Sequence, residues 1–345
     1  MVTFEIARRL VQQGNYVEWF SASFPGGPSE ETLDGVRIIR TGRQWTVHWA
    51  AFRRYRRVVS KQFDVVVDEV NTIPFFTPLW SGIPTVMFIH QLAREVWWYE
   101  SPFPISAIGY IAEPLYLRLY QKAPVVTVSQ STKNDLERMG FKGLITIIPE
   151  GIETMGQFLT SKCTEPTFLY VGRLAPSKRI GDILEAFAKF RREAGSGSLW
   201  LVGSGSERYR SSLLKRARNL NIAGKVHFCG RVSAEEKHRL MAQAHALLVT
   251  SVREGWGLVV TEANASGTPA IVYDVPGLRD SVRHDSTGLV VPARARSLAD
   301  AMIRLTSDPE LYDRLAAGGR RWSETFSFDE SARLFGLALE GTLAA

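Results

Sequence analysis

Short apolar runs alternate with helical patterns along the whole chain of 345 residues. Most runs are continuous stretches of Val, Ile, Leu and Phe, which is typical of parallel strands buried on both faces. The predicted strands are Tyr16–Phe20, Val36–Arg40, Asp64–Asp68, Thr85–His90, Val125–Ser129, Ile145–Pro149, Thr167–Gly172, Leu199–Gly203, Lys225–Gly230, Ala246–Ser251 and Ala270–Tyr273. The helical patterns between them include Arg179–Arg192, Glu207–Leu220 and Glu235–Ala244. This alternation predicts an α/β protein with two doubly wound, Rossmann-like domains.

The boundary between the two domains is expected at Pro149-Glu150-Gly151, followed by a polar connection through about Glu165. The first domain therefore covers residues 1–150 and the second covers residues 151–326. A further apolar helical pattern closes the chain over residues 327–345. No internal repeat or low-complexity tract interrupts this organisation.

The beginning of the chain departs from the usual pattern, in which a strand and a Gly-rich turn come before the first helix. Residues Phe4–Val11 are already helical, and Gly14 is suited to cap the end of that helix. We therefore expect the N-terminal domain to lack its first strand, which normally lies inside the sheet and would leave two unpaired edges. A start that lies late in the domain, a rearranged domain and a strand supplied by another chain all stay open as explanations.

Composition excludes several classes of protein but does not identify one. Hydrophobic residues make up 45% and charged residues 22%, which argues against disorder. Cys163 and Cys229 are too few for a disulfide framework or a four-ligand zinc site, and they favour a reducing cytoplasm. No apolar run approaches the roughly 20 residues of a membrane helix, and the N-terminus lacks the features of a signal peptide. The net charge of +7 is mild, so the placement of charges matters more than their sum.

The segment 251–262 carries the richest chemistry. Two carboxylates, Glu254 and Glu262, flank the turn Gly255-Trp256-Gly257, which follows an apolar strand and leads into a helix. Glycines let the backbone approach a ligand closely, and the N-terminus of a helix presents free N–H groups to a phosphate. Carboxylates suit the vicinal hydroxyls of a sugar. Two glutamates at this spacing alone would be chance, but strand, turn and helix together predict a site for a phosphorylated sugar.

Three further turns follow apolar strands in the second domain. Gly172 ends a strand, and the basic side chains of Arg173 and Lys178 come after it, where fixed cations suit a diphosphate. A glycine turn around Gly203 and a basic turn at Arg231-Val232 end two other strands. Each of these turns is a weak signal when taken alone, and solvated loop charges are the simpler interpretation of any one of them.

In this order, the motifs resemble those of retaining glycosyltransferases of family 4, which have the GT-B fold of two Rossmann-like domains facing a cleft. The resemblance rests on the pair Glu254 and Glu262 around Gly-Trp-Gly, and on the earlier Gly172, Arg173 and Lys178. It extends over the whole chain except its start. In the first half, Ile89-His90-Gln91 closes a strand, and Ile148-Pro149-Glu150-Gly151 matches the family's inter-domain motif with Glu150 in place of asparagine.

The resemblance implies a division of labour. Residues 1–150 would bind the acceptor, residues 151–326 would bind a nucleotide-sugar, and the last helix, 327–345, would return to the first domain. The implied catalytic residues are His90, Glu254, Arg173 and Lys178. The implied donor-binding residues are Gly172, Gly203, Arg231, Val232, Gly255, Trp256, Gly257, Leu258, Val259 and Glu262.

Each implied role follows the chemistry of sugar transfer. Arg173 and Lys178 would neutralise the leaving diphosphate, because fixed cations stabilise charge that develops in the transition state. Glu254 would bind hydroxyls of the donor sugar and Glu262 the nucleotide ribose. His90 would lie near the donor sugar and the acceptor, although a structural role for this residue stays open.

The chain contains no Asp-x-Asp sequence, the usual metal anchor of the other main glycosyltransferase fold. We therefore predict transfer without a metal or other cofactor. UDP, GDP and ADP stay open as the donor nucleotide, and the resemblance favours a UDP- or GDP-sugar. The resemblance further implies retention by front-face attack, in which the leaving phosphate helps to deprotonate the acceptor. The two glutamates are then ligands of the donor and not the acid and nucleophile of a glycoside hydrolase.

Residues 37–61 contain no acidic side chain and eight basic ones, namely Arg37, Arg40, Arg43, Arg53, Arg54, Arg56, Arg57 and Lys61. Trp45, Trp49, Phe52 and Val59 fall near one helical face of this stretch. A basic amphipathic helix can lie on an anionic membrane surface, whereas an ordinary domain helix would pack the aromatic stripe on the sheet. No nucleic-acid motif accompanies the charge. The aromatic run Val96-Trp97-Trp98-Tyr99 suits stacking on sugar rings, a lipid acceptor or core packing equally well.

The sequence therefore predicts a cytoplasmic glycosyltransferase, peripheral on the inner membrane face, that acts on a cell-envelope or lipid-linked glycan. Two alternatives remain. One is a catalytically impaired homologue that serves as a nucleotide-sugar binder or partner subunit, and the expected loss of the first strand is its best support. The other is a GT-B synthase that forms a sugar phosphate, which would use a small phosphosugar as its acceptor.

Overall fold

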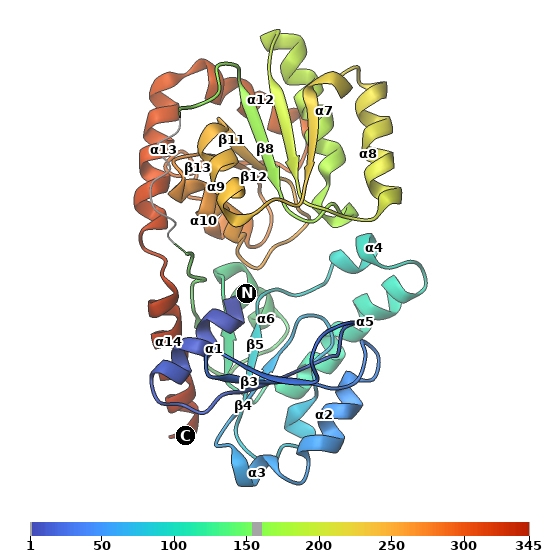
Figure 1. The fold of residues 1–345 in the computed structure, drawn as a ribbon, viewed down its shortest axis with the longest axis vertical. Helices are drawn as coiled ribbons and strands as arrows, with labels where there is room; N and C mark the ends of the chain where they lie inside the picture. The colour runs from blue at the N-terminus through green and yellow to red at the C-terminus, as the bar shows by residue number, and fades with distance from the viewer. Residues whose placement is uncertain (1, 154–160, 345) are drawn as a thin grey trace. The chain divides into compact units, whose positions relative to one another are not determined.

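The computed structural model describes residues 2–153 and 161–344 and divides the chain into two compact units (Figure 1). Unit 1 consists of Met1–Arg94, Gly109–Gly151 and Phe326–Ala345, and unit 2 consists of Glu95–Ile108 and Ile152–Thr325. The polar connection predicted over 151–165 lies partly outside the described residues, at 154–160. Each unit has its own sheets and its own core, as the predicted α/β architecture requires.

Unit 2 is built on one parallel sheet of six strands in the order β10-β9-β8-β11-β12-β13. The strands are β8 Thr167–Val171, β9 Ser198–Val202, β10 Val226–Gly230, β11 Ala246–Val249, β12 Ala270–Tyr273 and β13 Gly288–Val291. The order turns at β8 and β11, which are neighbours in the sheet although 75 residues separate Val171 from Ala246. Such a reversal of strand order is where ligands bind in doubly wound sheets, at the carboxyl ends of the strands.

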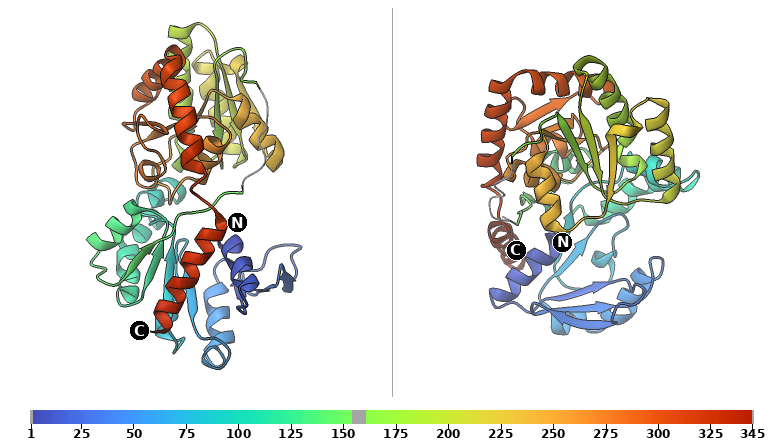
Figure 2. Two further views of the ribbon diagram at one scale, coloured as in Figure 1. Left: turned by 90° about the vertical axis from the view of Figure 1, so that its left-hand side faces the viewer. Right: turned by 45° about the horizontal axis from the view of Figure 1, so that its top comes forward.

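Two groups of helices cover this sheet, and Figure 2 shows them on both of its sides. The helices of the unit are α4 Val96–Glu100, α7 Ile180–Ala194, α8 Glu207–Asn219, α9 Ala234–Gln243, α10 Leu258–Ala265, α11 Leu278–Ser281, α12 Ala295–Ser307 and α13 Pro309–Ser323, with short 3₁₀ turns η3 Pro176–Lys178 and η4 Ala223–Lys225. Helix α7 packs with α8 and α12, and α10 packs with α9 and α13. Phe168, Leu247 and Ile271 are completely buried between the two layers, so the continuous apolar strands fill a core on both faces.

Unit 1 contains two separate sheets instead of one. Their elements are α1 Val2–Gln12, β1 Glu18–Ser21, β2 Glu30–Leu33, β3 Val36–Arg40, β4 Val66–Glu69, β5 Thr85–Ile89, β6 Val125–Thr127 and β7 Ile145–Ile147. One sheet has the order β1-β3-β2, with β2 antiparallel, and the other is the parallel sheet β4-β5-β6-β7. As the sequence predicts, the described part of the unit begins with a helix where a strand normally stands.

Both sheets are open, with edge strands β1 and β2 in the first and β4 and β7 in the second. Val17 and Ser21 turn their carbonyl groups toward β3, because Arg37 N–H donates to Val17 O and Thr41 N–H donates to Ser21 O. Since backbone groups alternate along a strand, the N–H groups of Glu18 and Phe20 point away from β3. The same alternation holds in β4, where Val66 N–H donates to Pro84 O. Within the part of the chain that the structure describes, β1 and β4 therefore each pair with a strand on one side only.

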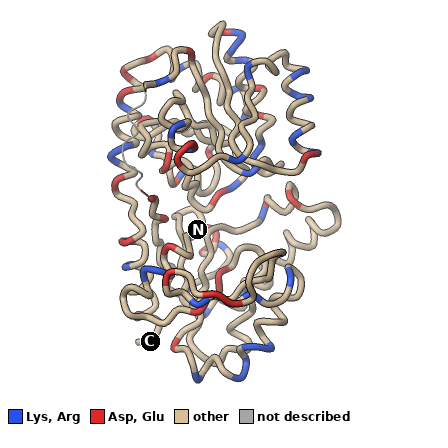
Figure 3. The backbone as a smooth tube through the Cα atoms, in the orientation of Figure 1, with Lys and Arg blue, Asp and Glu red and all other residues tan. Residues whose placement is uncertain are grey.

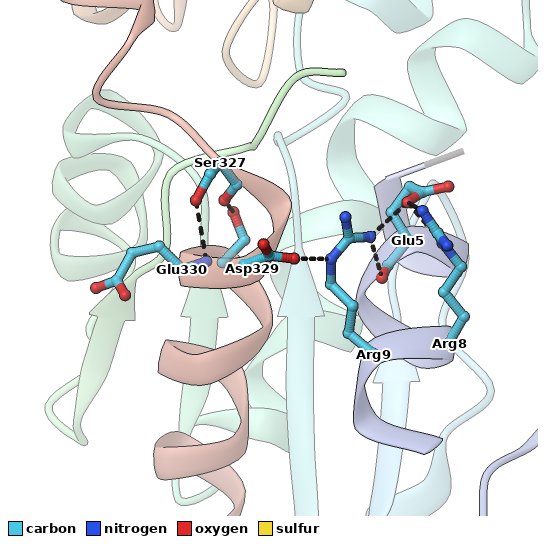
Figure 4. Close-up of polar contacts among 7 residues, drawn as sticks. Glu5, Arg8, Arg9, Ser327, Asp329 and Glu330 are labelled. Atoms are coloured by element: carbon cyan, nitrogen blue, oxygen red, sulfur yellow. Dashed lines mark hydrogen bonds and ion pairs between the residues drawn. The ribbon is translucent and has the colours of Figure 1, made fainter. Parts of the chain in front are cut away.

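The last helix, α14 Phe328–Leu343, packs on α1 within the same unit (Figure 4). Arg9 joins the two helices, because its guanidinium group binds Glu5 on α1 and Asp329 on α14, each at 2.5 Å. The Ser327 hydroxyl caps α14 by accepting from Glu330 N–H at 3.1 Å. The buried ring of Phe335 meets Phe88 of β5 edge to face at 5.2 Å, so α14 also covers the parallel sheet.

The remaining helical elements of unit 1 are α2 Val47–Tyr55, α3 Val59–Gln62, η1 Thr77–Leu79, η2 Arg118–Tyr120 and α6 Gln130–Arg138, and α5 Ile105–Leu117 spans the boundary between the two units. The aromatic stripe predicted over 45–59 is not one helical face, because α2 ends at Tyr55 and buries Val47, Ala51 and Tyr55. Trp49 lies on the exposed side of α2, and Trp45, in the turn before the helix, is exposed as well. Across residues 2–153 and 161–344, no helix has both the length and the apolar character to cross a membrane.

Candidate functional site

The two strongest sequence motifs meet at the carboxyl ends of β8 and β11. The backbone joins them first: Val252 N–H donates to Ser177 O at 2.9 Å, and the Thr250 hydroxyl donates to Lys178 O at 2.8 Å. Thr250 is completely buried, so these bonds fix the loop after β11 against the turn η3. The sequence spacing of the motifs is long, but adjacent parallel strands deliver both loops to the same edge of the sheet.

The side chains of this corner form a charged cluster. Lys178 Nζ makes an ion pair with Glu254 Oε1, and the Ser251 hydroxyl donates to the same carboxylate oxygen at 2.6 Å. Lys178 and Glu254 both keep about a fifth of their side-chain surface exposed, 22% and 19%. The cluster therefore combines a cation and a carboxylate that a ligand can reach, and two of its members are predicted catalytic residues.

Three glycines at the ends of β8, β9 and β10 bring the neighbouring loops into close contact. Gly203 N–H donates to Gly230 O at 2.7 Å, and Gly172 N–H donates to Val202 O at 3.0 Å. A Cβ atom at Gly203 would lie 1.8 Å from Gly172 O, and its φ of +133° disfavours any other residue. Gly172 and Gly203, both predicted site residues, thus allow the backbones of the loops after β8 and β9 to contact each other directly at the candidate site. Arg231 follows at the exposed end of β10, and Val232 packs partly against the core.

The turn before α10 presents unoccupied backbone donors. Gly257 precedes the helix with a φ of +93°, and the first helical bond runs from Val260 N–H to Gly257 O at 2.8 Å. Among the described residues, the N–H groups of Leu258 and Val259 have no backbone acceptor. Free N–H groups at the positive end of a helix dipole form an anion-binding arrangement. Leu258 and Val259 are therefore placed as a phosphate site requires.

The Trp256 side chain has a packing role. It is buried, and its indole N–H donates to the Thr261 hydroxyl at 3.0 Å, which holds the turn against the first part of α10. The neighbouring backbone is just as constrained, because a Cβ atom at Gly277 would lie 2.1 Å from Glu254 O. The prediction that Gly255, Trp256 and Gly257 line a sugar site stays a prediction.

Acidic partners that the sequence did not reveal hold two arginines near this corner, Arg173 and Arg253. Arg173 Nη1 lies 3.0 Å from Glu100 Oε2, and the Ser177 hydroxyl also donates to the Glu100 carboxylate. The buried Arg253 pairs with Glu95 at 3.0 Å, from the other end of α4. Both glutamates flank the aromatic run 96–99. The two glutamates could be seen in the sequence on either side of the aromatic run. Nothing in the sequence, however, connects these glutamates with loops more than 70 residues away.

Glu262 also has a partner that the motifs did not point to. Its carboxylate accepts from Lys237 Nζ of α9 at 2.7 Å, and both side chains are largely buried. Glu262 lies in the second turn of α10, on the same helix whose N-terminus carries the free N–H groups. Lys237 therefore already fixes the orientation of the Glu262 carboxylate to which the hydroxyl groups of a ligand would donate. Nothing in the sequence marked Lys237, because α9 carries three other charged residues in its first six positions.

His90, the predicted catalytic residue of unit 1, is held between two carboxylates. Its Nδ1 lies 2.7 Å from Glu150 Oε1 and its Nε2 lies 3.4 Å from Glu69 Oε1. Thr3 donates to the same Glu69 oxygen at 2.8 Å, and the Phe88 ring lies 4.4 Å from the imidazole. Burial alone would lower the pKa of His90, but the bonds to Glu150 and Glu69 outweigh it and raise this pKa to about 9. Burial alone would raise the pKa of Glu69, but the contact with His90 lowers this pKa below its ordinary value.

A charged His90 makes the stability of the protein depend on pH. Because the folded pKa of about 9 exceeds the ordinary value of 6.5, the stabilisation is complete below pH 6.5 and is lost as the pH rises through 9. The shift corresponds to roughly 3 kcal/mol at most. Urea unfolding followed by circular dichroism should therefore show a fall in the free energy of unfolding between pH 6.5 and 9.5, and the variant His90→Gln should lack that part of the fall.

Two measurements sharpen this test. The variant His284→Gln, at an exposed histidine of unit 2, should retain the full fall in stability between pH 6.5 and 9.5. An NMR titration of the His90 imidazole should give a midpoint well above the ordinary value, and a midpoint near 6.5 would contradict the contacts described above.

Comparisons with known proteins match both halves of the chain to glycosyltransferase families. Residues 1–155 match the family model described as Glycosyltransferase Family 4, and residues 152–322 match the one described as Glycosyl transferases group 1. A GDP-mannose-dependent alpha-(1-6)-phosphatidylinositol monomannoside mannosyltransferase of Mycobacterium tuberculosis is 33% identical over 165 residues, 46% of this chain and 42% of that protein. The chain thus aligns with less than half the length of that relative.

Solved structures share the fold over nearly the entire chain. Sucrose-phosphate synthase from Thermosynechococcus elongatus has a TM-score of 0.80 and 23% identity, covering 99% of this chain and 92% of its own. HepE of Anabaena, solved in complex with UDP and glucose, has a TM-score of 0.75 and 17% identity, covering 99% and 95%. Both halves of the chain match glycosyltransferase families, and its two Rossmann-like units have the fold of these enzymes. The chain belongs to the family 4-like group of glycosyltransferases with the GT-B fold.

Proposed function

We propose that this chain transfers a sugar from a nucleoside-diphosphate sugar to a glycan or lipid-linked acceptor, with retention of configuration and without a metal ion. The observation that carries the proposal is the corner of unit 2 where Lys178, Glu254 and Ser251 meet at the carboxyl ends of β8 and β11. The free N–H groups of α10 follow directly along the chain. A cation, sugar-binding oxygens and an anion-binding helix end are the three features that a nucleotide-sugar needs.

The charges of the corner suit the bond that breaks. When the bond between the sugar C1 and the phosphate oxygen breaks, its electron pair remains on the diphosphate. In this proposal, Lys178 and Arg173, both held in ion pairs, stabilise that charge, and the N–H groups of Leu258 and Val259 add backbone donors. These groups supply the positive charge that a metal ion provides elsewhere, which supports a metal-independent reaction.

Retention follows from the role that we assign to Glu254. Lys178 and Ser251 already hold this carboxylate, which suits a ligand of sugar hydroxyls better than a nucleophile. We infer that the acceptor oxygen bonds to C1 on the face from which the diphosphate departs. The acceptor proton then moves to a phosphate oxygen of the leaving group, so that no side chain of the protein has to take it.

The relatives support a range of donors and acceptors. By its name, the Mycobacterium tuberculosis relative uses GDP-mannose and a phosphatidylinositol mannoside, and HepE was solved with UDP and glucose. We therefore propose UDP- or GDP-sugars as donors and a glycan or lipid-linked acceptor of the cell envelope. The basic segment 37–61 supports a location at the cytoplasmic face of the membrane.

A donor screen tests the proposal. Purified protein is titrated with UDP, GDP and ADP by calorimetry and then incubated with the matching nucleotide-sugars and a lipid-linked glycan extract. We expect binding of one diphosphate, release of that diphosphate during turnover in the presence of EDTA, and an α-linked product from an α-linked donor by NMR. An inverted product or complete loss of turnover with EDTA would contradict the proposal.

The same screen separates the two alternatives. Binding of a nucleoside diphosphate without transfer or donor hydrolysis would identify an impaired homologue that serves as a nucleotide-sugar binder. Transfer restricted to a small phosphosugar would identify a synthase that forms a sugar phosphate, such as the activity named for the Thermosynechococcus elongatus protein.

A further inference from the structure

Glu100, at the end of α4, binds groups of the protein that lie at the candidate donor site. Its carboxylate accepts from Arg173 Nη1 at 3.0 Å and also from the Ser177 hydroxyl. Ser177 belongs to the turn η3 and directly precedes Lys178, the cation that pairs with Glu254. Helix α4 packs on η3 within unit 2. A carboxylate of the protein is therefore bound to the same turn that carries the assigned diphosphate cation.

The contact with Ser177 excludes a second acceptor. A serine hydroxyl has one proton to donate, and the Ser177 proton goes to the Glu100 carboxylate. Ser177 is buried, with 4% of its surface exposed, and its backbone carbonyl is held by Val252 N–H. Carboxylate and phosphate oxygens suit the same donors, namely hydroxyl and guanidinium groups. A phosphate oxygen that binds Ser177 must therefore displace Glu100.

The charges of this corner are balanced in pairs. Among the residues that the structure describes, three cations each meet one carboxylate, in the pairs Arg173–Glu100, Lys178–Glu254 and Arg253–Glu95. Figure 3 shows basic and acidic positions intermixed in unit 2, without a field of one sign. A nucleoside diphosphate is an anion, so it meets uncompensated positive charge at this corner only when one of the carboxylates withdraws.

Glu100 is the carboxylate that can withdraw at the lowest cost. Its partner Arg173 keeps 61% of its side-chain surface exposed, and an exposed ion pair contributes little stability. At the other end of α4, Glu95 pairs with Arg253, whose side chain is only 7% exposed. The pair of Glu95 holds α4 on unit 2 while Glu100 is displaced, so Glu100 stays close enough to return.

We propose that Glu100 competes with the diphosphate of the donor for Arg173 and Ser177, and that its return promotes release of the nucleoside diphosphate after transfer. Glu100 is thus a positioning residue that acts through these two side chains. No covalent bond changes, because one set of acceptor oxygens replaces another at the same donors. The inference rests on the proposed function, which assigns the diphosphate to this corner, and it adds a regulator of that site.

The variant Glu100→Gln removes the negative charge and retains the size of the side chain. Calorimetry with UDP and GDP should show that the Kd of the diphosphate that binds falls about fivefold or more. The constant for product inhibition by the same diphosphate should fall by the same factor. A carboxylate that only supports the local fold predicts weaker binding instead. Weaker or unchanged binding in folded Glu100→Gln would therefore overturn the proposal.

A double-mutant cycle identifies the partner through which Glu100 acts. When Arg173→Gln is already present, Glu100→Gln should improve the affinity for the diphosphate by a smaller factor than it does in the unchanged protein. An equally large improvement without Arg173 would show that Glu100 acts through its charge at a distance. That result would contradict the assigned competition for Arg173.

Glu193→Gln is the matched control for net charge. Glu193 lies in the last turn of α7, whose first turn follows η3, and it pairs with Lys189 at 3.8 Å. The control removes the same charge from unit 2 at the end of α7 that is distant from the corner. It should bind the diphosphate like the unchanged protein. Equal gains in Glu193→Gln and Glu100→Gln would overturn the proposal, because net charge would then explain the gain.

The unchanged protein separates a failure of this inference from a failure of the proposed function. If UDP, GDP and ADP all fail to bind it, both are wrong. If one diphosphate binds and Glu100→Gln binds it no more tightly, only the inference is wrong. Should Glu100→Gln not fold, hydrogen exchange of the unchanged protein decides. The amides of Trp98 and Ser101, which donate within α4 to Glu95 O and Trp97 O, should exchange faster when the diphosphate binds. Slower or unchanged exchange would overturn the proposal.

Discussion

Replacing Lys178 by alanine is expected to lower kcat for sugar transfer by roughly 10²–10³-fold, the effect of removing one fixed donor from a developing negative charge. Lys178 is the one predicted cation that the structure places in the same ion pair as the predicted sugar ligand Glu254. Its backbone is equally fixed, because its carbonyl oxygen accepts from the buried Thr250 hydroxyl. Contacts of both the backbone and the side chain therefore hold Lys178 in place.

The kinetic pattern distinguishes transition-state stabilisation from simple binding. The Lys178 cation meets more charge after the bond to the diphosphate breaks than before it, so kcat should fall far more than KM rises. Lys178→Arg should recover part of the activity, because it retains the charge but not the shape of the ammonium group. Stopped-assay rates of nucleotide release and calorimetric affinity for the diphosphate give the two quantities separately.

Lys189→Ala is the matched control for this prediction. Lys189 of α7 is as exposed as Lys178, 25% against 22%, and also forms an ion pair, with Asp300. Its removal should leave kcat within twofold, because a surface ion pair contributes about 1 kcal/mol or less to stability and this one lies outside the corner. If both variants lost activity equally, or if Lys178→Ala retained full kcat, the assigned role of Lys178 would be wrong.

The sequence predicted which loops of unit 2 meet, because their glycines and charges directly follow strand ends. Glycines and charges that directly follow buried parallel strands must meet at one edge of the sheet, whatever their distance along the chain. Lys178 and Glu254 were therefore predicted separately and meet in the structure. The strands of unit 2 were equally readable, since a parallel strand buried on both faces is apolar throughout. Among the described strands of unit 2, only β13 went unpredicted, a short apolar run that forms one edge of the sheet.

The sequence could not reveal contacts whose partners come from irregular segments. Glu95 and Glu100 reach Arg253 and Arg173 from a short helix that the contacts assign to unit 2, far from the loops in sequence. Strand β2 was missed for a different reason, because it lies at a sheet edge, is mostly exposed and has no apolar alternation. The exposure of Trp49 was also unpredictable, since periodicity places a residue on a helical face but does not decide what covers that face.

Replacing Gly203 by alanine is expected to destabilise unit 2 by about 3 kcal/mol or more and to abolish binding of the nucleoside diphosphate. The added Cβ atom would lie 1.8 Å from Gly172 O and 2.8 Å from Gly172 C, both backbone atoms that no rotamer change can move away. The loops after β8 and β9 must then separate. The bond from Gly172 N–H to Val202 O lies directly between them, so it would be the first to break.

Two other glycines of unit 2 separate the steric clash at Gly203 from the backbone cost of its left-handed φ. Gly195 also has a left-handed φ, +76°, but a Cβ atom there meets nothing within 4 Å, so Gly195→Ala measures the backbone cost alone, about 1 kcal/mol. Gly224→Ala meets nothing within 4 Å and has no such φ, so it should be nearly neutral. Urea unfolding of the three variants should give the order Gly203, Gly195, Gly224, from the largest loss of stability to the smallest.

Binding measured on the folded variants then decides what the close approach of the loops is for. Where Gly203→Ala is still folded, calorimetry with UDP or GDP should show no binding, while Gly195→Ala and Gly224→Ala bind like the unchanged protein. Normal affinity in folded Gly203→Ala would mean that the loops after β8 and β9 can separate without harm to the donor site. The glycine would then be required by the fold alone, and the phosphate would be held by Lys178, Arg173 and the N-terminus of α10 without help from this turn.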